Sequence, residues 1–191
     1  MRWASSGIIR SWIDRHWGTT MEMAEAGYLY TVAILGMTFI GFSAIVMLLR
    51  QAIGLKLRPF DALFAHVYME FGLIISAGAM LPPLVRFWEA SPQMAWQISS
   101  ALVGVPLLLF GLTYPARRRA ASGEDTPMYV RINVSIVILI SLALLINASG
   151  LVHARAAAVF LSALTAFMIF AVGSWLRALN LIMLRKAQSR R

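Results

Sequence analysis

The sequence contains no cysteine, and charged residues make up only 13% of its 191 residues. Without cysteine the chain can form no disulfide, no thiolate metal site and no thiol nucleophile. A water-soluble domain usually has about 25% charged residues. Hydrophobic residues instead make up 60% of this chain, more than a soluble fold of its length can bury. The composition therefore predicts a membrane protein.

Several charge-poor stretches are longer than the roughly 18 apolar residues that mark a membrane span. They predict an all-α, polytopic membrane helix bundle with five transmembrane helices. The second span is expected to close at Pro82-Pro83 and the third, which contains Pro106, at Tyr114-Pro115. The predicted spans cover residues 27–49, 62–84, 94–112, 132–148 and 156–176.

Three regions follow from these spans: an N-terminal extracytoplasmic tail (1–25), the transmembrane domain (26–184) and a basic cytoplasmic tail (185–191). Apolar residues recur at helical spacing in the first tail, so residues 3 to 17 are predicted to form an interfacial amphipathic helix. Its apolar part is too short and too charged for a secretory signal. The alternative is that translation starts at Met21 or Met23.

Lysine and arginine are unevenly distributed between the two ends of the spans. Twelve of the 17 fall on the side that includes the C-terminus, and five on the other. The positive-inside rule then predicts a multi-pass protein of the cell inner (plasma) membrane, with its N-terminus outside and its C-terminus in the cytoplasm. Anionic lipid headgroups, rather than nucleic acid, explain the net charge of +9. The residues expected to contact them are Arg117, Arg118, Arg119, Arg185 and Lys186.

The second span contains two ionisable residues, His66 and Glu70, which are four apart and therefore share one helical face. Glu70 lies eight residues beyond Ala62, which places it about 12 Å into a hydrocarbon layer about 30 Å thick. An ionised carboxylate at that depth costs several kcal/mol unless it is paired or hydrated. We therefore expect the pair to face protein or water.

Three functions are compatible with this pair. In a proton or cation site, Glu70 would bind and release the ion, His66 would tune it, and Tyr68 or Asn133 would add oxygen ligands. In a structural pair, the two would hydrogen-bond each other, Asn133 or Ser135 and tie helices together. A haem or redox-metal site is disfavoured because the other histidines lie near the opposite side of the membrane. We predict no metal and no cofactor, and the absence of an HExxH motif argues against a zinc protease.

Small residues lie on the opposite face of the second span. Gly72, Ser76 and Ala79 would let a neighbouring helix approach closely, so this span is predicted to be the central helix. The candidate contact faces are Ser100 with Gly104 on the third span, and Ala158, Ser162 and Ala166 on the fifth.

Two hypotheses follow. The first is a small proton or cation channel or transporter, expected to be a homo-oligomer because five spans are few to enclose a pathway. The second is a non-conducting accessory or scaffold subunit bound to a partner membrane protein. Neither hypothesis makes the chain an enzyme.

Overall fold

The computed structural model describes the backbone of residues 6–52, 59–123, 125–152 and 155–188, and the side chains of 25–49, 51–52, 62–123, 125–152 and 155–177. The described residues form five α-helices and no strand. All five helices are long and apolar enough to cross a membrane, which confirms the predicted all-α, five-span fold. The helices are α1 (Ser6–Ala52), α2 (Pro59–Arg86), α3 (Pro92–Ser122), α4 (Met128–Ala148) and α5 (Ala156–Gln188).

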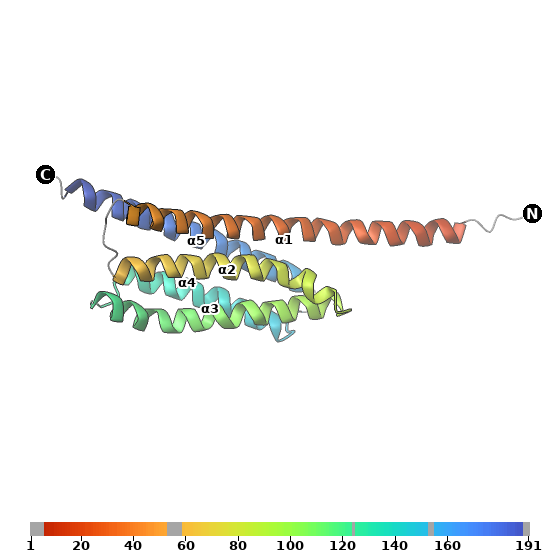
Figure 1. Ribbon diagram of the computed structural model, residues 1–191. Coiled ribbons are helices and arrows are strands. Elements are labelled where there is room, and N and C mark those ends of the chain that lie inside the picture. Colours follow the sequence, from red (N-terminus) through yellow and green to blue (C-terminus); the bar gives the residue numbers. More distant parts are fainter. Residues whose placement is uncertain (1–5, 53–58, 124, 153–154, 189–191) are drawn as a thin grey trace, which may run out of the picture.

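α1 is one helix of 47 residues, and its N-terminal part runs far beyond the rest of the bundle (Figure 1). At about 1.5 Å per residue it is about 70 Å long, more than twice the thickness of the hydrocarbon layer. The N-terminal segment thus continues the first span, where a separate interfacial helix was expected. No proline precedes Pro59 that would break the helix between the two parts.

The helix ends predicted at prolines are wrong. α2 continues through Pro82 and Pro83 to Arg86, and α3 continues through Pro106 and Pro115. Membrane helices tolerate proline because neighbouring groups satisfy the carbonyls that it frees. α3 is therefore longer than its predicted span, and its last turns carry Arg117, Arg118 and Arg119, which lie beyond the end predicted at Tyr114-Pro115.

Gly123 ends α3. Its φ of 68° is in the left-handed region, and its backbone N–H donates to the carbonyl of Arg119 at 2.9 Å. This is a common way for a helix to stop, because glycine adopts a positive φ without steric cost. Residues 125–127 lead into α4, whose first residue is Met128.

α2 is in contact with α1, α3 and α5. At the centre of the bundle the ring of Phe71 lies edge-on to Phe110 of α3, at 4.8 Å between centroids, and to Phe167 of α5, at 5.0 Å. Phe160 and Phe167 are fully buried. In a membrane such van der Waals contacts hold helices together, because lipid is as apolar as the side chains.

α1 and α2 approach most closely at small residues. A Cβ added to Gly36 would lie 3.1 Å from the carbonyl oxygen of Gly72 and would collide with the Ser76 hydroxyl. That hydroxyl donates to the carbonyl of Ala33 at 3.0 Å. Gly72 and Ser76 therefore lie against α1, while Ala79 is fully buried in the core.

Gly36→Ala tests this close approach. The new methyl group would overpack the α1–α2 interface and lower the free energy of unfolding in detergent by about 1–3 kcal/mol. Gly41→Ala is the matched control on the same helix, since a Cβ at Gly41 meets nothing within 4 Å. It should be neutral or slightly stabilising. Equal unfolding temperatures for the two variants would contradict the close contact.

Candidate functional site

The carboxylate of Glu70 on α2 is bound by the guanidinium of Arg117 on α3. Arg117 Nη1 donates to Glu70 Oε2 at 3.0 Å, and Nη2 donates to Oε1 at 2.8 Å. Two parallel charged hydrogen bonds of this kind are stronger and more directional than a single one. Both side chains keep about a third of their surface exposed, 36% for Arg117 and 37% for Glu70.

The direction of helical side chains brings these two groups together. Side chains on an α-helix lean toward its N-terminus. α2 and α3 run antiparallel (Figure 1). Glu70 therefore leans toward the end of the bundle where α2 begins, whereas Arg117 leans inward from the last turns of α3. The long arginine side chain covers the remaining distance. The ion pair thus lies on the side of Glu70 that faces the start of α2 and the end of α3.

His66 does not share this contact. Its side chain is exposed, and Nδ1 lies 3.4 Å from the carbonyl of Ala62 in its own helix. The structure therefore gives Glu70 the partner Arg117 where His66 was expected. A guanidinium offers two aligned donors and a permanent charge, which an imidazole does not.

The other two predicted site residues lie elsewhere. Tyr68 is 5% exposed and packs edge-on against Phe64, at 4.6 Å between ring centroids, and Phe39, at 5.9 Å. Asn133 is half-buried on α4. Both oxygens of the Glu70 carboxylate are bound by Arg117. Among the described side chains, no hydrogen bond or ion pair joins Glu70 to His66, Tyr68 or Asn133.

The arginines at the end of α3, which were expected to contact lipid headgroups, also have partners within the chain. Arg117 is paired with Glu70, and Arg118 is 7% exposed and hydrogen-bonded to Tyr114. Arg119 is exposed, and its Nη2 lies 3.0 Å from Asp125 Oδ1. Two of the three arginines thus face protein, because α3 remains helical beyond its predicted end at Tyr114-Pro115. The side chains of Arg185 and Lys186 lie outside the described side chains.

A second polar cluster lies near the C-terminal end of α4, at the other end of the bundle from Glu70 and Arg117. Asn147 is 1% exposed, and its Nδ2 donates to Ser100 Oγ at 2.8 Å and to the carbonyl of Ala156 at 2.9 Å. These two bonds join α4 to α3 and to the first residue of α5. Ser141 Oγ donates to the carbonyl of Gly104 at 2.7 Å. The predicted contact face at Ser100 and Gly104 therefore lies against α4, while Asn147 gave too weak a sequence signal to be recognised as the link between three helices.

Among the described residues, no three His, Asp or Glu side chains gather in a way that could hold a metal ion. Comparison of the chain with protein-family models, curated proteins and solved structures finds no match. Function is therefore inferred from the geometry of the bundle alone.

A double-mutant cycle at the ion pair tests its contribution to stability. Arg117→Gln should lower the free energy of unfolding by about 2 kcal/mol and Glu70→Gln by about 1 kcal/mol. The asymmetry is expected because an arginine left alone near a helix end can extend to the headgroups, whereas the short Glu70 side chain cannot. The free energy of unfolding of the double variant should fall by less than the sum of the two single losses. Strictly additive losses in denaturant titrations would show that the two side chains are not coupled.

Proposed function

We propose that this chain is a non-conducting helical subunit of a membrane assembly, a scaffold or accessory protein, in which the Glu70–Arg117 pair fastens α2 to α3. The observation that supports this most strongly is that both carboxylate oxygens of Glu70 bind Arg117. A proton or cation carrier must bind and release its ion at an available group. In this bundle the acid in the second span is already neutralised by a fixed positive charge.

The apolar layer between the two polar clusters also favours this function. On the buried face of α3, only Leu107, Phe110 and Gly111 lie between Gly104 and the arginines. Gly104 and Arg117 are 13 residues apart, or about 20 Å along the helix. A conducting route needs polar or hydrated groups across such a distance. The described interior of the single chain offers packed aromatic and aliphatic side chains there.

α1 has the exposed apolar surface that an accessory subunit would use. It packs along α2 and contacts α5 where Phe39 meets Trp175, at 5.8 Å between ring centroids. Ile34, Met37 and Phe42 remain more than half exposed, at 65%, 58% and 57%. The partner in this proposal is another membrane protein that lies along this helix.

Conduction by a homo-oligomer is the second candidate. The partial exposure of Glu70 and Arg117 favours it, because groups that are about a third exposed could line a path formed between copies of the chain. In that case Glu70 would exchange Arg117 for a proton or cation during transport.

Ion flux in proteoliposomes separates the two candidates. We expect the wild-type protein to pass protons and common cations between pH 5 and 8 no faster than protein-free liposomes do. Glu70→Gln should leave that baseline unchanged while lowering the unfolding temperature. Flux in the wild type that vanishes in a folded Glu70→Gln variant would overturn the proposal and make Glu70 part of a conducting path.

The orientation is also part of the proposal, with the C-terminus in the cytoplasm as the arginine distribution predicts. The lack of native cysteine allows a direct test. In intact cells, an impermeant thiol reagent should label Leu151→Cys, at the α4–α5 turn, and should reach Ser122→Cys only after lysis. The reverse labelling pattern would invert the topology.

A further inference from the structure

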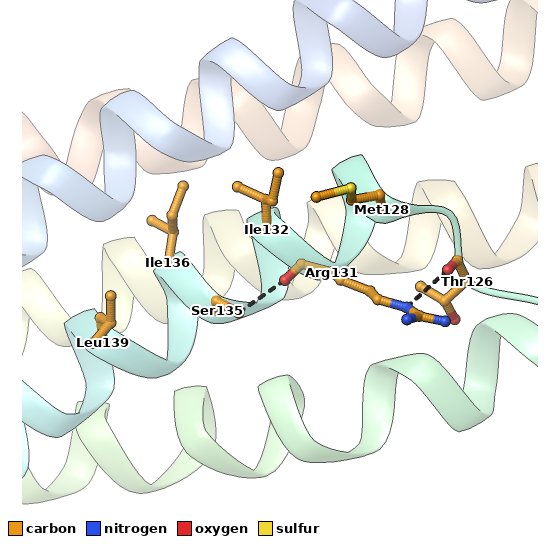
Figure 2. Close-up of a pocket in the computed structure, with 7 residues that line it drawn as sticks. All are labelled: Thr126, Met128, Arg131, Ile132, Ser135, Ile136 and Leu139. Carbon is orange, nitrogen blue, oxygen red and sulfur yellow. Dashed lines mark hydrogen bonds between the residues drawn. The ribbon is translucent and has the colours of Figure 1, made fainter.

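Two grooves lie end to end along α4. The first has a volume of about 680 Å³ and is lined by α4 and the turn before it, from Thr126 to Leu139. Figure 2 shows Ile132, Ile136 and Leu139 in a row along the helix, with Arg131 extended toward Thr126 at one end. The second groove, of about 500 Å³, lies between α4 and α5 and reaches from Leu139 to Arg155. Leu139 lines both grooves.

The position of Leu139 assigns each groove to one leaflet. α4 runs from Met128 to Ala148, so Leu139 lies 11 residues from its start and 9 residues from its end. These distances are about 16 Å and 14 Å, and each is close to half of the hydrocarbon thickness of about 30 Å. Arg131 and Arg155 lie at the outer ends of the two grooves. Each groove therefore has a basic end at a membrane surface and an apolar end at the midplane.

Arg131 and Arg155 can both bind an anionic ligand. The ion pairs among the described side chains join Arg117 to Glu70 and Arg119 to Asp125, and neither includes Arg131 or Arg155. Arg131 Nε donates to the carbonyl of Thr126 at 3.1 Å, which uses one of its five donors and holds the guanidinium at the mouth of the groove. The Arg155 side chain is exposed at the mouth of the second groove.

The walls of the grooves suit acyl chains. Ile132 is 52% exposed and Leu139 is 64% exposed, so both offer apolar surface to an acyl chain. In the second groove, Ala158 and Ser162 of α5 are exposed, and their small side chains leave the space that a larger residue would fill. The predicted contact face on the fifth span thus borders an open groove.

We propose that the groove along α4 binds two anionic phospholipids, one in each leaflet. The phosphate of one lipid lies on Arg131 and that of the other on Arg155, and their acyl chains extend along α4 toward Leu139. Basic pockets beside membrane helices recognise anionic headgroups in this way. The complementarity of charge at both ends, together with a length that matches the bilayer, favours phospholipid over a protein partner. The proposal does not depend on whether the chain conducts ions.

Native mass spectrometry of the detergent-solubilised protein tests this binding. The protein is titrated with phosphatidylglycerol and with phosphatidylcholine of the same acyl chains. We expect two tightly held phosphatidylglycerol molecules and a clear preference over phosphatidylcholine. Arg131→Gln and Arg155→Gln should each weaken one of the two binding steps about fivefold, and the double variant should weaken both. Arg119→Gln is the matched control, since Arg119 is an exposed arginine outside the grooves, and it should change neither step.

Ala158→Phe provides a second measurement that leaves the charges unchanged. The added ring should fill the second groove and reduce the binding of both lipids there, while the Arg131 site keeps its preference. Thermal unfolding shows whether each variant is folded. Equal binding of the two lipids by the wild type would overturn the proposal. So would cross-linking of Leu139→Cys between two copies in liposomes, because that would make the groove a protein interface.

Discussion

The bidentate contact between Glu70 and Arg117 is the constraint on which the arrangement of the other helices depends. An ionised carboxylate within a membrane span needs a partner, and a partner with fixed geometry sets the height of one helix relative to the next. Because Arg117 lies near the end of α3, it reaches Glu70 only if α3 remains helical beyond Pro115. The ion pair therefore requires the long third helix.

α2 has three different surfaces, and each contacts another helix through a different kind of interaction. Gly72 and Ser76 allow the backbone of α1 to come close, Phe71 packs between the rings of α3 and α5, and Glu70 binds α3. Van der Waals contact, aromatic packing and a charged hydrogen bond thus meet on one helix. This explains why a bundle without a hydrophobic driving force between its helices can still have one defined arrangement.

The five spans could be predicted from the sequence because the length of an apolar run reports directly on the thickness of the bilayer. The helix ends could not, because rules for proline come from soluble helices, whereas α2 and α3 continue through Pro82, Pro83 and Pro115. The partner of Glu70 was missed for the same reason. With α3 ending at Pro115, Arg117 would belong to a loop, and the nearest candidate on the same helix face is His66.

Counting arginines in the sequence does not show which of them are exposed in the folded bundle. The positive-inside rule weighs Arg117, Arg118 and Arg131 equally, since all three lie at the end of the bundle where α3 stops and α4 begins. In the structure Arg117 and Arg118 turn toward protein, whereas Arg131 is exposed at the mouth of an apolar groove. A positive charge that is neutralised within the bundle adds little to the attraction of anionic lipid. The charges left for the membrane are therefore fewer than the sequence suggests, and those at Arg131 and Arg155 border apolar surface that an acyl chain can cover.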